Sequence, residues 1–235
     1  MPAIKDLIRI AVADDDLSVL QLFCNHINTL DKCKVVIQAT NGIELLKAMK
    51  EKPEVDLVIL DIKMPLVDGY EIAKYIRKSY PGIRVVFYSV FKSELAHQLM
   101  VVSGGHGLIE KSKSIEEAKK VIKTVIKGKY CFPALEEEIE INGEKNISMS
   151  RNSLVDITPA EINFMRLSVA DLPYKQIAAE LHISERQVEY MRDTMFKKLN
   201  VHSKVGLVIK ALECGFVTLP PADIPEYLFE LRTAI

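Results

Sequence analysis

Short apolar runs that each end at a polar side chain constrain the fold of this chain most. The apolar runs cover residues 8–13, 57–60, 85–88 and 107–109. Stretches with helical periodicity lie between them. A continuous apolar run of this length is typical of a strand buried on both faces of a parallel sheet. Strand and helix patterns alternate up to about residue 127, and a less apolar strand is predicted at residues 34–39. The pattern predicts an α/β doubly wound parallel sheet of five strands.

Polar side chains stand at or just beyond the ends of four of these strands. They are Asp14, Asp15, Asp16, Asp61, Ser89 and Lys111. Ligands of doubly wound sheets bind outside the carboxyl ends of the strands, so these groups are expected in one pocket. Carboxylates at such short distances repel each other unless a hard cation binds them. Mg²⁺ is the usual cation in sites that also bind phosphate. The sequence therefore predicts a phosphoryl-transfer site with Asp61 as acceptor.

The remainder of the chain is expected to be helical. Residues 158–161 (TPAE) and 184–187 (SERQ) have the pattern of capping boxes at helix starts. A short helix at residues 174–181, a turn at 182–183 and a longer helix to residue 199 form a helix-turn-helix pattern. An acidic segment lies between the two regions. The predicted division is residues 1–127, an acidic linker 128–153, an all-α helix-turn-helix domain 154–217 and a tail 218–235.

The bulk properties allow a two-domain protein without targeting signals. A chain of 235 residues is long enough for two domains, and its formal net charge is −1. No apolar stretch approaches the length of a membrane span, and the first residues lack a signal-peptide pattern. We therefore expect a cytoplasmic protein without membrane contact.

Ordered motifs in both halves resemble a known family. Residues 10–16 (IAVADDD), 58–71 (VILDIKMPLVDGYE), 85–89 (VVFYS) and 107–112 (GLIEKS) resemble the receiver domain of two-component response regulators. Residues 154–165 and 174–204 resemble a LuxR-type DNA-binding domain. Together they are similar to the NarL/FixJ class of transcription regulators, which implies a flavodoxin-like receiver and no enzyme turnover.

The resemblance implies a role for each residue of the predicted pocket. Asp61 would accept a phosphoryl group from a histidine kinase, while Ser89 and Lys111 would each contact a phosphoryl oxygen. The Mg²⁺ ligands would be Asp14, Asp15, Asp61 and the backbone carbonyl of Lys63. Family members usually carry an aromatic residue three positions before the lysine. This chain has Leu108 there, so phosphorylation is expected either to be coupled to output by another packing change or to be coupled only weakly.

The predicted recognition helix carries acids among its exposed positions. Its core face is expected to hold Val188, Met191, Met195 and Leu199. The candidates for DNA contact are Arg186, Glu189, Tyr190, Asp193, Lys197 and Lys198. Residues 151–217 hold nine Lys and Arg against eight Asp and Glu, so this domain is only weakly basic. An acid can read cytosine N4 while basic residues at the rim hold phosphates. Promoter binding would then require a homodimer on double-stranded DNA.

Two alternatives remain open at this point. One is a phosphorylation-controlled adaptor whose helical domain binds protein. The other is a phosphatase of the haloacid dehalogenase type. That class expects an acid two residues after its nucleophile, and this chain has Lys63 there. Each Asp after a strand can also be a simple helix N-cap. A separate, simpler interpretation of Glu189 and Asp193 is that they only form ion pairs along the helix, with Arg186 and Lys197.

Overall fold

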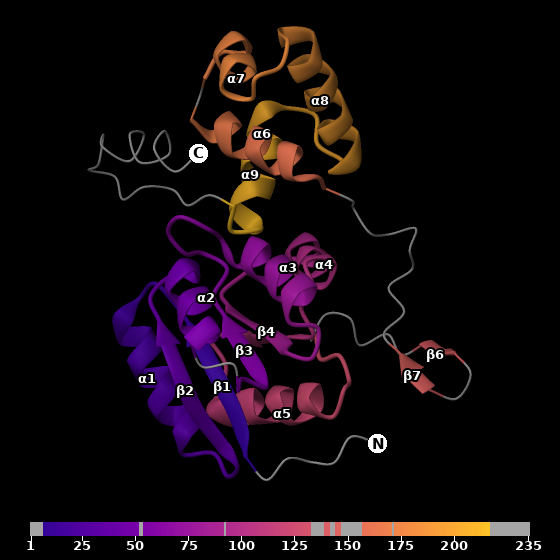
Figure 1. Ribbon diagram of the computed structural model, residues 1–235. Helices are drawn as coiled ribbons and strands as arrows, with labels where there is room; N and C mark the ends of the chain where they lie inside the picture. Colours follow the sequence, from indigo (N-terminus) through magenta and orange to yellow (C-terminus); the bar gives the residue numbers. More distant parts are fainter. Residues whose placement is uncertain are drawn as a thin grey trace. The chain divides into compact units, whose positions relative to one another are not determined.

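The computed structural model describes residues 7–51, 54–91, 93–132, 139–141, 144–146, 157–170 and 172–216. Backbone contacts divide the chain into two units, residues 1–153 and 154–235. Figure 1 shows an α/β unit, in indigo to magenta, and an all-helical unit, in orange to yellow.

The first unit contains the predicted parallel sheet. Its five strands lie in the order β2-β1-β3-β4-β5, and every pairing is parallel. The strands are β1 (Ile8–Ala13), β2 (Cys33–Ala39), β3 (Leu57–Leu60), β4 (Arg84–Ser89) and β5 (Gly107–Glu110). The helices are α1 (Leu17–Asn28), α2 (Gly42–Glu51), α3 (Gly69–Ser79), α4 (Glu94–Val102) and α5 (Ile115–Ile126). The predicted fold class is confirmed, and strand order reverses between β1 and β3.

Helices cover both faces of the sheet (Figure 1). On one face, Ile10 and Ile59 belong to an apolar cluster with Phe23 of α1 and Ile122 of α5. On the other face, the ring of Phe87 packs against Tyr70 of α3 at a centroid distance of 5.7 Å. Because β3 is central, all four of its side chains are buried. This explains its unbroken apolar sequence.

The segment predicted as a linker contains two features that the sequence did not indicate. Residues 139–141 (β6) and 144–146 (β7) form a two-stranded antiparallel hairpin. Closer to α5, Cys131 forms a parallel bridge with Gly107 of β5. The predicted tail at residues 218–235 lies outside the described residues. The division into these four segments remains a prediction.

The second unit contains a helix-turn-helix among its four described helices. It comprises α6 (Pro159–Val169), α7 (Tyr174–Glu180), α8 (Glu185–Lys198) and α9 (Lys204–Glu213). Both predicted capping boxes are present: Thr158 with Glu161, and Ser184 with Gln187. The turn between α7 and α8 is closed by His182, whose φ is +54°. Within the described ranges, no helix is long and apolar enough to cross a membrane.

Candidate functional site

Three carboxylates meet at the carboxyl edge of the sheet. Asp14 and Asp15 follow β1, and Asp61 follows the adjacent strand β3. One ligand oxygen from each residue lies within 4.8 Å of the other two. Asp14 is fully buried and Asp61 is 5 % exposed, whereas Asp15 is open to solvent. This acidic cluster (Asp14, Asp15 and Asp61) therefore has a buried floor and one accessible side.

Lys111 supplies a positive charge to the buried floor of the cluster. Its Nζ lies 2.6 Å from Asp14 Oδ2 and 3.2 Å from Asp61 Oδ2. The backbone N–H of Lys111 donates to the Ser89 carbonyl at 3.0 Å, which joins the end of β5 to the end of β4. The Tyr88 ring lies 5.3 Å from the ammonium and was not foreseen as part of the site. Predicted neighbours from four strand ends are thus brought together.

The electrostatics of the cluster favour binding of a cation. Burial raises the pKa of Asp61 to about 6, and the charge of Asp14 adds to this rise while Lys111 opposes it. Burial also raises the pKa of Asp15, against the opposing charge of Lys63. Three carboxylates face the single ammonium of Lys111, so their negative charge exceeds its positive charge when all three are ionised. Because all three donors are carboxylate oxygens, the set fits a hard divalent cation such as Mg²⁺.

Two predicted residues make local hydrogen bonds. Asp16 is the N-cap of α1, and its Oδ1 accepts from the N–H groups of Ser18 and Val19. This agrees with the simpler interpretation of an Asp after a strand. The Ser89 side chain is fully buried, and its Oγ accepts from the N–H of Phe91 at 3.2 Å. Among the described residues its hydroxyl hydrogen has no acceptor, and the predicted contact with a phosphoryl oxygen stays a prediction.

The loop after Asp61 is shaped by a glycine. Gly69 donates its N–H to the Ile62 carbonyl at 2.8 Å, which closes the loop against the end of β3. A Cβ on Gly69 would lie 2.2 Å from the Asp61 carbonyl oxygen and 2.9 Å from Ile62 Cα. Both neighbours are backbone atoms. Only glycine at position 69 therefore allows this loop to pack so closely against the backbone of Asp61 and Ile62.

Replacing Gly69 with Ala is expected to lower the free energy of unfolding by about 3 kcal/mol, because backbone must move to relieve the overlap. Urea denaturation of the full chain measures this. The matched control is Gly82→Ala, since a Cβ on Gly82 has no atom within 4 Å. That variant should stay within about 0.5 kcal/mol of the wild type. Equal stability of the two variants would contradict the proposed constraint.

Leu108 is part of the core rather than of the pocket. It lies on β5, three residues before Lys111, and is 1 % exposed. Its Cα partner on β4 is Phe87. An aromatic ring does lie over the Lys111 ammonium, but it belongs to Tyr88, which stacks on Phe23 of α1 at a centroid distance of 3.9 Å. The register between β4 and β5 brings Tyr88 close to Lys111, because Ser89 pairs with Glu110, the residue just before the lysine.

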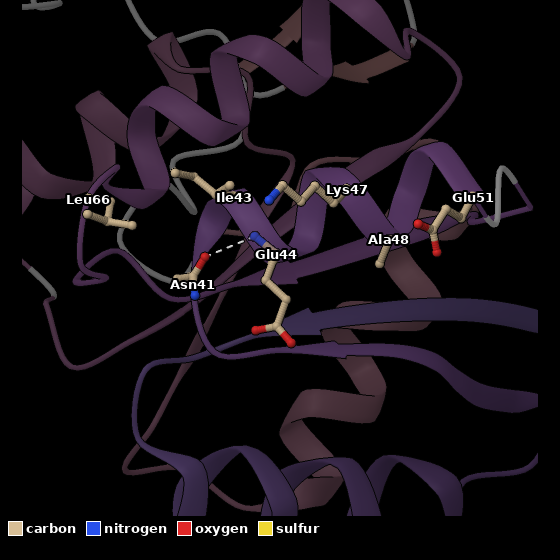
Figure 2. A pocket seen from close by; sticks show the side chains of 7 residues that line it. All are labelled: Asn41, Ile43, Glu44, Lys47, Ala48, Glu51 and Leu66. Carbon is tan, nitrogen blue, oxygen red and sulfur yellow. Dashed lines mark hydrogen bonds between the residues drawn. The ribbon is translucent and has the colours of Figure 1, made fainter.

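A pocket near α2 is separate from the acidic cluster. Figure 2 shows its lining residues, which come from the start and body of α2 and from the loop after Asp61. They are Asn41, Ile43, Glu44, Lys47, Ala48, Glu51 and Leu66. None of the three clustered carboxylates lines it. Lys111 does not line it either, so we assign this pocket no part in the site.

The second unit presents a polar face on α8. Five candidates for DNA contact are exposed, and Tyr190 is 75 % exposed. We call them the α8 surface: Arg186, Glu189, Tyr190, Asp193 and Lys197. The core face holds the buried Val188, Met195 and Leu199 as predicted, whereas Met191 is only half-buried.

Several charged side chains of α8 form ion pairs within the second unit. Arg192 Nε and Nη2 each lie 2.8 Å from Asp193 Oδ1, and its guanidinium lies over the Tyr174 ring. Lys198 Nζ lies 2.7 and 2.9 Å from the two oxygens of Glu161. Lys198 therefore joins α8 to α6. Its predicted contact with DNA remains untested, and its charge is already partly neutralised.

Comparison with known families agrees with this architecture. Residues 10–123 match the family described as response regulator receiver domain. Residues 156–211 match the family described as bacterial regulatory proteins, luxR family.

Known proteins match nearly the whole length of this chain. The response regulator GacA of Pseudomonas viridiflava is 28 % identical over 214 residues, covering 90 % of this chain and 98 % of GacA. The transcriptional regulatory protein LnrK of Bacillus subtilis is 27 % identical over 218 residues, covering 89 % of this chain and 98 % of LnrK. A solved complex of the response regulator RcsB with DNA is 17 % identical, with a TM-score of 0.62 over 86 % of this chain and 97 % of RcsB. This chain belongs to the two-component response regulators of the NarL/FixJ class, transcription regulators that join a receiver domain to a LuxR-type DNA-binding domain.

Proposed function

We propose that this protein is a cytoplasmic response regulator in which phosphorylation of Asp61 by a histidine kinase controls DNA binding. The observation that carries the proposal is the acidic cluster with its lysine. Three carboxylates lie within 4.8 Å, and Lys111 Nζ contacts two of them at 2.6 and 3.2 Å. Such a site can neutralise the charge on a transferred phosphoryl group.

The proposed chemistry is in-line transfer to the Asp61 carboxylate. An oxygen of Asp61 forms a bond to phosphorus as the bond from phosphorus to the donor imidazole nitrogen breaks. Positioning and charge neutralisation dominate the catalysis of this reaction. Lys111 then pairs with one phosphoryl oxygen, and the Ser89 hydroxyl donates to another. Mg²⁺ held by Asp14, Asp15, Asp61 and the Lys63 carbonyl would supply the remaining charge neutralisation.

We further propose that α8 enters the major groove of double-stranded DNA. Residues in the first half of a recognition helix contact base edges, and basic residues at its rim contact phosphates. Glu189 and Tyr190 lie in the first two turns of α8. Arg186 and Lys197 are exposed and fit phosphate contacts. The RcsB neighbour was solved as a complex with DNA, which supports this assignment by fold.

The two acids of the α8 surface, Glu189 and Asp193, differ in their ion pairing. One oxygen of Asp193 is bound by Arg192, so the charge of Asp193 is partly neutralised. No such pair engages Glu189 among the described residues. An unpaired acid close to base edges can accept a hydrogen bond from cytosine N4. We therefore assign cytosine selection to Glu189 and a positioning role to Asp193.

Selection of DNA from a random pool tests the Glu189 assignment. Wild-type protein should enrich a cytosine at one position of each half-site. In Glu189→Ala the enrichment of cytosine over the other bases at that position should fall by roughly tenfold. Lys197→Ala is the matched control, because losing a phosphate contact weakens binding to all sequences alike. An unchanged base preference in Glu189→Ala would contradict the assignment. Failure of wild-type protein to enrich any DNA would count against α8 as a recognition helix.

A protein-binding output domain is the second candidate function. It is favoured by the three exposed acids on α8, Glu185, Glu189 and Asp193, and by the pairing of Lys198 with Glu161. The salt dependence of binding distinguishes the two functions. A DNA-binding domain shows a linear fall of log affinity with log salt concentration, because counterions are released from phosphates. We expect that slope, and a phosphorylated homodimer that places two copies of α8 on two half-sites.

A further inference from the structure

The chain returns to the sheet after α5 and pairs with the outer edge of β5. The Leu108 N–H donates to the Cys131 carbonyl at 3.0 Å, and the Cys131 N–H donates to the His106 carbonyl at 2.9 Å. Since β5 is the last strand of the five-stranded sheet, this pairing covers backbone groups at the edge. The start of the segment predicted as a linker is thus joined to the receiver.

Side chains hold this pairing in place. Phe132 is 2 % exposed, and the Tyr130 ring stacks on His106 at 5.4 Å with an interplanar angle of 13°. A Cβ on Gly107 would lie 2.9 Å from the Cys131 carbonyl oxygen, so glycine admits the close approach. We call residues 130–132, where they pair with residues 106–108, the β5 clamp.

The other end of β5 leads directly to the acidic cluster. Lys111 follows the strand and lies three residues beyond Leu108. Along its inner edge the strand is bonded to β4, ending with the hydrogen bond from Lys111 N–H to the Ser89 carbonyl. A strand of four residues that is bonded on both edges has little freedom to absorb a shift at one end. A displacement of Lys111 must therefore reach the clamp.

We propose that the β5 clamp couples occupancy of Asp61 to the segment that leads to the second unit. This rests on the proposed phosphorylation of Asp61. A phosphoryl group there draws Lys111 Nζ away from Asp14 and pulls the end of β5 with it. Because Phe132 is buried in the core, the two clamp hydrogen bonds break first: Leu108 N–H to the Cys131 carbonyl, and Cys131 N–H to the His106 carbonyl. The clamp takes over the coupling role of the aromatic residue that family members usually carry at the position of Leu108.

Thermodynamic linkage makes the coupling reciprocal. If occupancy of Asp61 opens the clamp, then opening the clamp by mutation must strengthen binding at Asp61 by the same factor. Beryllium fluoride with Mg²⁺ serves as the probe, because it imitates a phosphoryl group on a carboxylate without a covalent donor.

Hydrogen exchange of the wild-type full chain is the first test. On addition of beryllium fluoride and Mg²⁺, the Leu108 and Cys131 amides should exchange at least about tenfold faster. The amides of the central strand β3 should not change. Unchanged exchange at Leu108, with beryllium fluoride bound, would overturn the clamp. Absence of binding at Asp61 would instead refute the proposed function.

Two variants provide the reciprocal test by calorimetric titration. Phe132→Ala removes the buried anchor, and Cys131→Pro removes the N–H donated to His106. Both should bind beryllium fluoride about fivefold or more tightly than the wild type. Leu45→Ala is the control, since Leu45 is equally buried but lies on α2. Equal affinities in all four proteins would overturn the coupling. The wild-type exchange test decides the question if the variants do not fold.

Discussion

Replacing Asp61 with Asn is expected to reduce phosphorylation by acetyl phosphate to background. The amide lacks the nucleophilic carboxylate, and the two neighbouring acids are placed differently. Asp14 is fully buried and paired with Lys111, while Asp15 is on the solvent side of the cluster. Incorporation is measured by intact-protein mass spectrometry in the presence of Mg²⁺. Removing Mg²⁺ with a chelator should also reduce incorporation by the wild type to background.

The matched control for this experiment is Asp16→Asn. Asp16 stands next to the acidic cluster but caps α1 through its side-chain oxygen, and Asn caps helices equally well. This variant should retain wild-type phosphorylation. Stoichiometric phosphate on the Asp61→Asn variant, mapped to another residue, would refute the assignment of the acceptor.

Replacing Lys111 with Met is expected to cause the largest loss of stability, about 3–5 kcal/mol at pH 8 without metal. The change leaves Asp14 and Asp61 buried without their nearby ammonium. Mg²⁺ should recover most of the loss, because the cation replaces the missing positive charge. Urea denaturation of the full chain with and without Mg²⁺ measures both effects. Lys74→Met is the control, since its pair with Glu71 lies at the surface and should contribute under 1 kcal/mol.

The sign of the pH dependence follows from the raised pKa of Asp61. The folded protein binds this proton more tightly than the unfolded chain, because the pKa rises from 3.8 to about 6. The associated stability is complete below about pH 4 and is lost as pH rises through about 6. The penalty of Lys111→Met should therefore be smaller at pH 5 than at pH 8. An equal penalty at both pH values, with no recovery by Mg²⁺, would show that Lys111 acts only through packing.

The sheet and its site were predictable because the strands are short, continuous and apolar. A parallel sheet places all carboxyl strand ends at one edge, so Asp14, Asp61 and Lys111 had to converge once the strands were recognised. The N-cap role of Asp16 was also foreseeable from its position before a helix. Tyr88 was missed because its contact with Lys111 depends on the register between β4 and β5.

Contacts between distant segments could not be predicted in this way. The capping-box pattern indicated Glu161, but nothing local indicated that Lys198, 37 residues away, binds the same carboxylate. The bridge from Cys131 to β5 is likewise carried by backbone groups, which leave no trace in side-chain periodicity. Gly107 was the single sequence sign of it, since only its missing side chain admits the carbonyl of Cys131.

The proposal that Asp61 controls the output is tested most directly by the affinity of the full chain for DNA. A duplex obtained by selection is titrated by fluorescence anisotropy, with protein that is either unmodified or phosphorylated by acetyl phosphate and Mg²⁺. We predict that phosphorylation changes the Kd by about fivefold or more, and that Asp61→Asn protein shows no change. Identical Kd values for unmodified and stoichiometrically phosphorylated wild-type protein would contradict the proposed switch.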